Sequence, residues 1–271
     1  MAELPEISKL SRQMKSVLCG KKITDIDILQ EKCANISPAD FRARTRNAVI
    51  KDVENKGKWI ITSLDNGEYI LLSLGMGADV YFYEAKREEE KYQIEVLFSD
   101  KSGYTARFWW FGKFFLVSEE ELKEESNTKD IAIHPFEEAF SYPYFQSLLK
   151  GKKTRVKAFI LNQHNIGGIG NMYAHDILFT ARLHPQKKIS DMKEKEIKAL
   201  YEAILGVLRS AEEKGSFFYE KDFFGQNGGF TENDFLVGYK KDKPCPICAT
   251  PIVSIKTGST SSFICPHCQT L

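Results

Sequence analysis

Hydrophobic and polar positions follow a helical period at the start of the chain. Apolar side chains fall on one helical face, at Ile7, Leu10, Met14, Val17 and Leu18. The pattern predicts a short amphipathic helix from Pro5 to Cys19, which Gly20 ends.

The pattern changes between residues 22 and 117, where short β-branched and aromatic runs alternate with turns such as Asn66-Gly67. The clearest runs are Trp59–Thr62, Tyr69–Leu72, Val80–Tyr83 and Glu95–Phe98. Short strands divided by turns predict an antiparallel β-sandwich or barrel in this part of the chain.

Helical periodicity returns after a polar stretch, Ser118 to Asp130, that we interpret as a linker. The periodic segments are Tyr142–Leu149, Val156–Asn162, Met172–Ala181 and Lys193–Ala211. We therefore expect an α+β multidomain protein, with a helix and an antiparallel β-sandwich first and a helical domain second. The expected boundaries are 1–118 for helix and sandwich, 119–134 for the linker, 135–237 for the helical domain and 238–271 for a C-terminal finger.

The finger is expected because the last cysteines form two Cys-x-x-Cys pairs. They are Cys245 with Cys248 and Cys265 with Cys268. A two-residue gap lets both thiolates of a knuckle reach one ion, so this spacing predicts a structural Zn²⁺ with four sulfur ligands. Two disulfides are the alternative, although nothing else in the sequence indicates an oxidising compartment. We assign no chemistry to Cys19 and Cys33.

Composition and charge narrow the class of protein. The chain is 42% hydrophobic, enough for ordinary packed cores, and its formal net charge of +1 does not by itself indicate a nucleic-acid partner. It lacks a secretory leader and any apolar run of about 18 residues, so we expect a cytoplasmic protein without membrane contact. The segment from Lys150 to Lys157 carries five positive charges in eight residues. Such a run is typical of a binding patch or of a solvated surface.

A glycine-rich turn, Gln163 to Tyr173, lies between two predicted helices. We expect Asn171 to cap the second helix, where exposed backbone amides can hold a phosphate. A dinucleotide site is disfavoured because a helix, not a strand, precedes the glycines. The alternative is a tight corner between two helices.

Three features now coincide in one order: Glu3 with Pro5-Glu6, the Gly167 to Tyr173 turn, and two cysteine knuckles that close with Cys268-Gln269. Together they resemble the formamidopyrimidine-DNA glycosylase and endonuclease VIII family of base-excision repair enzymes, from Met1 to Leu271. The resemblance implies a β-sandwich and a helical domain with a helix-two-turn-helix and a zinc finger, which clamp DNA between them. Further matches are Gly57–Trp59, Leu74–Met76, Lys157 and Phe179–Pro185.

The resemblance also implies a mechanism. An uncharged N-terminal amine attacks C1′ of a flipped nucleotide, expels the damaged base and leaves a Schiff base, after which β- and δ-elimination cut the strand. Ala2 would supply the amine and Glu3 a general acid/base, and Lys58 would complete the catalytic group. Lys58, Lys157 and Asn171, with the finger, would hold phosphates, and Met76 would fill the hole left by the flipped base.

The chain departs from the family at its N-terminus. The family usually starts Met-Pro-Glu, whereas Ala2 stands here in place of the proline. A primary amine at Ala2, exposed when Met1 is removed, can still form an imine. A retained Met1 would move the amine by one residue, about 3.8 Å.

Two DNA-contacting positions also differ. The family's Arg-Arg-Phe-Gly loop appears as Trp109-Trp110-Phe111-Gly112, so stacking would replace hydrogen bonding at the base opposite the lesion and weaken its discrimination. The alternative places Trp109 or Trp110 in the sandwich core. The arginine of the family's finger tip aligns with Thr260, whose hydroxyl can bond a phosphate but carries no charge.

The leading hypothesis is a DNA glycosylase with AP lyase activity on oxidised bases or abasic sites, acting on double-stranded damaged DNA as a monomer, associated with the nucleoid when bound. The second is a non-enzymatic binder of abasic or kinked DNA that uses the same clamp. The third, a zinc-stabilised interaction scaffold, leaves the glycine turn and the basic run unexplained. The aromatic stretch from Ser216 to Phe230 can cap a flipped base or pack against the helices.

Overall fold

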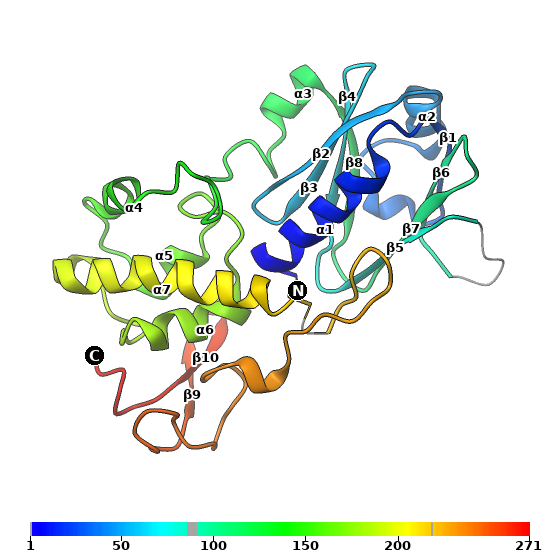
Figure 1. Cartoon of the computed structure of the whole chain (residues 1–271). Helices are drawn as coiled ribbons and strands as arrows, with labels where there is room; N and C mark the ends of the chain where they lie inside the picture. The colour runs from blue at the N-terminus through cyan, green and yellow to red at the C-terminus, as the bar shows by residue number, and fades with distance from the viewer. Residues whose placement is uncertain (1, 86–90, 218) are drawn as a thin grey trace. The chain divides into compact units, whose positions relative to one another are not determined.

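The computed structural model in Figure 1 describes residues 2–85, 91–217 and 219–271. The chain forms two compact units, each made of two separate stretches. The first unit is Met1–Asp130 with Ser216–Gly229, and the second is Ile131–Gly215 with Phe230–Leu271.

The first unit is built around two four-stranded antiparallel sheets. One has the order β1-β6-β7-β5 and the other β2-β3-β4-β8. The strands are β1 (Ile23–Ile28), β2 (Ile50–Lys56), β3 (Trp59–Leu64), β4 (Glu68–Ser73), β5 (Ala78–Tyr83), β6 (Ile94–Phe98), β7 (Gly103–Phe108) and β8 (Lys113–Ser118). Side chains from both sheets share one buried cluster, for example Val96 with Phe114. The predicted sandwich is therefore confirmed.

Helices close the sandwich. The predicted amphipathic helix is α1 (Leu4–Leu18), whose apolar face enters the same cluster. The sequence did not indicate η1 (Glu31–Cys33) or α2 (Pro38–Thr45). Helix α2 starts where the Ser37 side chain accepts a hydrogen bond from the Asp40 N–H, and its Phe41 ring stacks on Phe114 with centroids 4.9 Å apart. A short helix, α3 (Glu119–Glu124), lies in the stretch interpreted as a linker.

The segment Ser216–Gly229 follows the helical region in sequence but belongs to the first unit. Phe223 enters the sandwich core, with its ring 5.9 Å from Tyr104 and 5.8 Å from Phe82. The Phe82 N–H donates to the carbonyl of Phe223 at 2.8 Å, so the segment extends the β5 edge. Figure 1 shows it as the gold loop beside β5.

The second unit contains α4 (Tyr142–Leu149), α5 (Val156–Leu161), α6 (Asn171–Thr180), η2 (Ile189–Asp191) and α7 (Glu194–Glu213). The four α-helices correspond to the four predicted segments, whereas the sequence did not indicate η2. After α7 and the excursion to the first unit come η3 (Glu232–Asp234) and a hairpin of β9 (Val253–Thr257) and β10 (Thr260–Ile264). Asp176 of α6 anchors residues 236–238, which follow η3, because its carboxylate accepts the N–H groups of Leu236, Val237 and Gly238.

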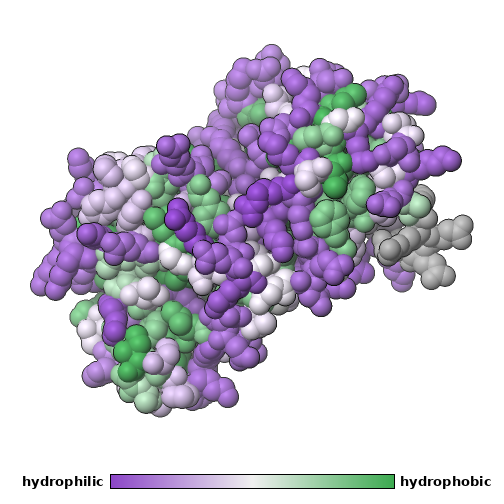
Figure 2. Space-filling view, in the orientation of Figure 1, coloured by the Kyte–Doolittle hydropathy of each residue, from purple (hydrophilic) through white to green (hydrophobic). Residues whose placement is uncertain are grey.

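Among the described residues, no helix combines the length and apolar character needed to cross a bilayer. On the face shown in Figure 2, hydrophilic side chains predominate and hydrophobic ones gather in separate patches. Buried apolar side chains fill the cores of the two units.

Candidate functional site

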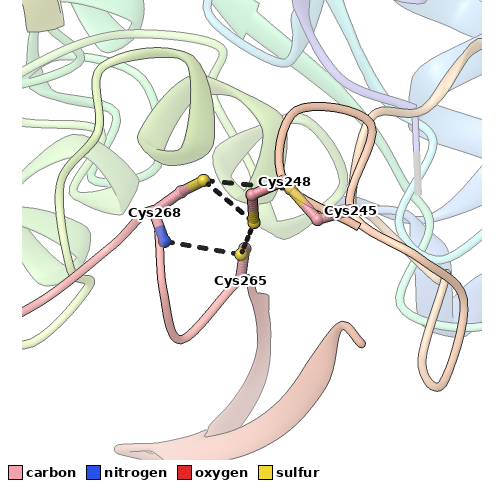
Figure 3. A group of neighbouring side chains, drawn as sticks. All are labelled: Cys245, Cys248, Cys265 and Cys268. Atoms are coloured by element: carbon pink, nitrogen blue, oxygen red, sulfur yellow. Dashed lines mark hydrogen bonds between the residues drawn. The ribbon is translucent and has the colours of Figure 1, made fainter. Parts of the chain in front are cut away.

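The four finger cysteines converge, as Figure 3 shows. All four sulfur atoms lie within 4.8 Å of one another, and the Cys248–Cys265 and Cys245–Cys268 Sγ distances are 3.4 and 3.9 Å. A disulfide needs about 2.05 Å, so these pairs are not bonded. Sulfurs placed about 2.3 Å from one tetrahedral zinc would be about 3.8 Å apart, so the cluster fits a structural zinc site.

The chemistry of these thiols favours a cation at their centre. Burial, with contributions from the neighbouring sulfurs, raises the pKa of Cys268 to about 12, whereas hydrogen bonds with Thr250 lower the pKa of Cys248 to about 6. A bound Zn²⁺ deprotonates its coordinating thiols, so metal binding here releases protons. Backbone N–H groups of Ile247 and Cys268 donate to Cys245 and Cys265 Sγ at 3.4 Å, which supports the thiolate form at each knuckle.

The N-terminal residues singled out from the sequence lie together at the start of α1. Ala2 is 2% exposed and Glu3 is buried. Glu6 holds this turn, because its Oε2 accepts the Glu3 N–H at 2.9 Å. Desolvation lowers the pKa of Lys58, while the carboxylates of Glu3 and Glu6 oppose that shift. The structure thus brings Glu3 and Lys58 within electrostatic reach of each other, and Ala2 directly precedes Glu3.

Sequence reasoning missed the polar groups that attach the segment Ser216–Gly229 to this region. Glu6 Oε1 accepts the Phe217 N–H at 3.3 Å, and the Gln13 side chain donates to Asp222 Oδ2 at 2.8 Å. Glu220 is buried, which raises its pKa, and the charge of Glu3 adds to the shift. No local sequence pattern identifies these contacts, because Gln13 and Asp222, for example, are 209 positions apart in the chain.

A second group of predicted residues forms an exposed tip on the first unit. Met76 is 50% exposed, and Trp109, Trp110 and Phe111 are 54%, 67% and 77% exposed. The alternative that Trp109 or Trp110 belongs to the sandwich core is therefore wrong. The Trp109 ring lies 6.4 Å from Tyr219, so it contacts the segment Ser216–Gly229 instead.

Two loops make this tip, and backbone contact joins them. The Met76 N–H donates to the Trp110 carbonyl at 2.8 Å. Gly75, at a φ of +59°, permits this approach, because a Cβ there would lie 2.1 Å from the Trp110 carbonyl oxygen. Met76 and the aromatic loop are consequently one apolar projection.

In the second unit, Lys157 is buried against the β9–β10 hairpin. Its Nζ lies within 3.1 Å of Thr257 Oγ1, Thr260 Oγ1, Ser261 O and Ser262 Oγ. Desolvation lowers the pKa of Lys157 to about 8. A cavity of about 240 Å³ opens beside it, lined also by Arg155 and Ser259. The structure thus joins two predicted residues, Lys157 and Thr260.

Asn171 does not cap α6, contrary to the expectation from sequence. Gly170 is the N-cap and Asn171 is the first residue of the helix. Its side-chain amide turns along the helix and lies 3.3 Å from His175 Nε2. Asn171 Oδ1 is enclosed, with no hydrogen-bond partner in the described part of the chain.

His175 connects Asn171 to the finger. Burial lowers the pKa of His175 to about 3, helped by the charge of Lys157, so the ring is neutral. Its Nδ1 accepts the Phe263 N–H at 3.4 Å, which leaves the proton on Nε2. The carbonyl oxygen of Asn171 is then the group suited to face Nε2, and the amide NH₂ becomes the group with an unfilled bond.

A β-sandwich, a helical unit with a glycine-rich two-turn corner and a four-cysteine finger define the class of helix-two-turn-helix zinc-finger proteins. Three protein-family models match the chain: the formamidopyrimidine-DNA glycosylase N-terminal domain over residues 1–111, its H2TH domain over 131–220, and the zinc finger found in FPG and IleRS over 242–271. The chain belongs to the formamidopyrimidine-DNA glycosylase family.

Relatives match along the whole length. The formamidopyrimidine-DNA glycosylase of Mycoplasma genitalium is 32% identical, over 99% of this chain and 96% of the relative. That of Pelotomaculum thermopropionicum is 31% identical, over 99% of each. The fold is similar to that of Lactococcus lactis Fpg in a complex with abasic-site DNA, with a TM-score of 0.90, 23% identity and full coverage of both chains.

Proposed function

We propose that this protein is a base-excision-repair DNA glycosylase with AP lyase activity, acting on oxidised bases or abasic sites in double-stranded DNA. The observation that carries the proposal is that Ala2 and Glu3 are buried just before α1, and that the carboxylate of Glu3 acts on the Lys58 ammonium, in a member of this family. A single chain suffices for one lesion. The protein would work in the cytoplasm, at the nucleoid when bound to DNA.

The reaction starts from the amine of Ala2 after removal of Met1. The amine nitrogen forms a bond to C1′ as the bond from C1′ to the damaged base breaks, and the base leaves with a proton. Glu3 exchanges protons with the sugar and the amine as the Schiff base forms. An α-amine is suited to this role because it titrates near pH 8, so part of it is uncharged at neutral pH.

The other site residues would bind DNA. Lys58 contributes a cation beside Glu3, where a phosphate next to the flipped sugar would be attracted. Met76, Trp109 and Phe111 supply the apolar surface that would enter the DNA duplex, since all three side chains are exposed on the two joined loops of the first unit. Lys157, Asn171 and Thr260 supply donors for phosphates from the second unit.

The first test is borohydride trapping on abasic duplex DNA with protein whose mass shows loss of Met1. We expect a covalent adduct that peptide mapping places on Ala2. Glu3→Gln should slow base release by about 10²- to 10⁴-fold, as expected for loss of a general acid/base. Lys58→Met should weaken binding to lesion DNA, because it removes the cation proposed to attract a phosphate, and Lys51→Met, which removes an exposed charge on β2, is its control. If protein that has lost Met1 forms no adduct, the proposed lyase activity is contradicted.

The second candidate function is a binder of abasic or kinked DNA without catalysis. Ala2 in place of the family's proline favours it, because a primary amine replaces the usual nucleophile. It requires tight lesion binding that survives Glu3→Gln, with no strand cleavage by any variant. Cleavage that Glu3→Gln abolishes would exclude it.

A further inference from the structure

Glu220 is a buried carboxyl group that the proposed chemistry does not use. The residue is 5% exposed and lies in the segment Ser216–Gly229 of the first unit. A carboxylate loses most of its hydration when it is buried this far, so it needs either a cation beside it or a proton of its own. The neighbours of Glu220 therefore decide what it can do.

Hydrogen bonds on both sides of Glu220 tie the segment to α1. Before it in the chain, the Phe217 N–H donates to Glu6 Oε1 at 3.3 Å, in the first turn of the helix. After it, the Phe223 N–H donates to Gln13 Oε1 at 3.1 Å, further along the same helix. Because both anchors are on α1, Glu220 is held beside that helix.

The charges that act on Glu220 show which end of α1 it faces. Burial is the main cause of its raised pKa, and the negative charge of Glu3 adds to the rise. The positive charge of the chain's N-terminus acts in the opposite sense and lowers the pKa. Electrostatic effects weaken with distance, so Glu220 faces the start of the chain, where Ala2 precedes Glu3.

The other charged groups of this region are engaged elsewhere. Glu6 and Lys9 come from α1, Lys58 from the turn between β2 and β3, and Asp222 from the segment itself. Glu6 and Asp222 accept backbone N–H groups, and Lys9 Nζ lies 5.4 Å from the centre of the Phe217 ring. Lys58 is a cation and cannot accept a hydrogen bond from an ammonium. Glu220 is thus well suited to serve the terminal amine.

The amine of Ala2 needs such an acceptor more than a proline nitrogen would. A primary ammonium has three N–H groups and rotates about its bond to Cα, whereas a charged proline nitrogen has two and is fixed in a ring. The lone pair of the amine points at C1′ only when the remaining N–H groups are held in place. A fixed carboxylate can supply that orientation in a chain with Ala2 at this position.

We propose that Glu220 orients the amine that Ala2 gains when Met1 is removed, and that its carboxylate takes a proton from this amine before the attack on C1′. One N–H bond of the ammonium breaks, one O–H bond forms on Glu220, and the freed electron pair of the nitrogen makes the bond to C1′. Burial favours this step, because a poorly hydrated carboxyl group accepts a proton more readily. The inference rests on the proposed function, since it needs this amine as the nucleophile.

The test is a double-mutant cycle between Glu220→Gln and Ala2→Pro, in protein whose mass shows loss of Met1. The readout is the single-turnover rate of adduct formation on abasic duplex DNA, trapped with borohydride. Glu220→Gln keeps the shape of the side chain and should slow the reaction at neutral pH by about 10²-fold, as expected for loss of a positioned base. Combined with Ala2→Pro, the same change should cost much less, because the ring already fixes the nitrogen.

The dependence of this rate on pH separates the proposed role from a structural one. A neighbouring carboxylate stabilises the ammonium and raises the pKa of the amine, so Glu220→Gln should move the rise in rate to lower pH. Glu220→Asp keeps the charge and should retain the wild-type pH profile at a reduced rate. Affinity for a duplex with a tetrahydrofuran abasic analogue should not change. Glu54→Gln, at an exposed carboxylate on β2, is the matched control and should match the wild type throughout.

The outcomes distinguish this inference from the proposed function. If the wild type forms the adduct and Glu220→Gln equals it in rate and pH profile, the inference is overturned while the function stands. An equal loss with and without Ala2→Pro, and no shift of the pH profile, overturns it as well, because that result indicates a structural role. If Glu220→Gln does not fold, a pH profile of Glu220→Asp that is shifted to lower pH overturns the inference. Wild-type protein that has lost Met1 and forms no adduct overturns both proposals.

Discussion

Lys157 illustrates what a single buried charge does in this molecule. Four oxygen atoms of the finger hairpin lie within 3.1 Å of an ammonium that has three protons to donate. The cation therefore holds the hairpin to α5, while the hydroxyls of Thr257 and Thr260 each donate to the backbone carbonyl of the other residue, at 3.3 and 3.4 Å. Thr260, which lacks the charge of the family's arginine, would act on a phosphate together with this lysine.

The Lys157 ammonium predicts a pH effect. Its pKa is about 8 in the folded protein against an ordinary 10.5, so the folded chain binds fewer protons between these values and stability from this group rises with pH there. The positive charge that Lys157 can offer to a phosphate is lost as the pH rises through about 8. Affinity for uncleavable lesion DNA should fall from pH 7 to 9, and Lys157→Met should flatten that fall and reduce the salt slope at pH 7 by about one.

Fluorescence anisotropy over a salt series at each pH measures both effects. Lys153→Met removes an exposed charge from the same basic run and should retain the wild-type pH dependence. Equal pH profiles for the wild type and Lys157→Met would show that the ammonium makes no contribution to DNA binding.

Residue identity could be predicted where the pattern is local. The zinc ligands follow from two short spacings, Cys245 to Cys248 and Cys265 to Cys268, and the structure gathers all four sulfurs. Asn171 was misjudged by one position, because Gly170 takes the extended conformation that caps α6. Gln13 could not be identified as an anchor, since both its partners lie in a segment more than 200 positions away.

Among the elements of the fold, the segment Ser216–Gly229 is the one for which the structure adds most to what the sequence indicates. Its sequence allowed capping of a base or packing on helices, and the structure shows it attached to α1 and to the β5 edge. Phe223 is the anchor, because its ring is fully buried among the side chains of the sandwich. Phe224, the next residue, stays 45% exposed.

This contrast gives a matched pair of variants. Phe223→Ala should destabilise the first unit by about 3–5 kcal/mol, because it leaves a cavity in the core. Phe224→Ala should cost about 1 kcal/mol or less, as is usual for a partly exposed side chain. Urea denaturation followed by tryptophan fluorescence measures both. Similar small losses in the two variants would show that the segment is not part of the folded core.

Strand positions were predicted only where runs are apolar. The segments Trp59–Thr62, Tyr69–Leu72, Val80–Tyr83 and Glu95–Phe98 all fall in strands. Strands β1 and β2 carry charged residues at every few positions and gave no comparable signal. Each nevertheless contributes to the core, β1 through Ile23, Ile26 and Ile28 and β2 through Ile50 and Val53. Pairing with a neighbouring strand, rather than local composition, stabilises such elements.

For the whole molecule, the chain path makes two units that differ in how they are stabilised. The first has a large apolar core, and the helices of the second also bury apolar side chains such as Phe159 and Ile204. The finger, in contrast, has only a small cluster of Phe179, Val237 and Ile252 with all four of its cysteines. So small a core depends on the metal for its stability. Zinc should therefore affect the second unit and leave the sandwich folded.

Removal of zinc tests this division. A chelator, or Cys265→Ser, should abolish the order of the β9–β10 hairpin and lower affinity for lesion DNA at least tenfold, with little change in the unfolding of the first unit. Amide hydrogen exchange resolves the two units, and zinc loss should become easier as pH falls because the thiols regain protons. Cys19→Ser, at an exposed thiol, is the control. Unchanged exchange in the hairpin would contradict a structural zinc.

The sequence by itself determined the order of the parts, the zinc ligands and the family, because these depend on short spacings and on local periodicity. Tertiary structure decided which distant residues meet: Gln13 with Asp222, Lys157 with Thr260, and the aromatic loop with Met76. It also decided that the tryptophans of that loop face solvent. Burial and contact depend on how segments far apart in the chain pack, and no local pattern records that.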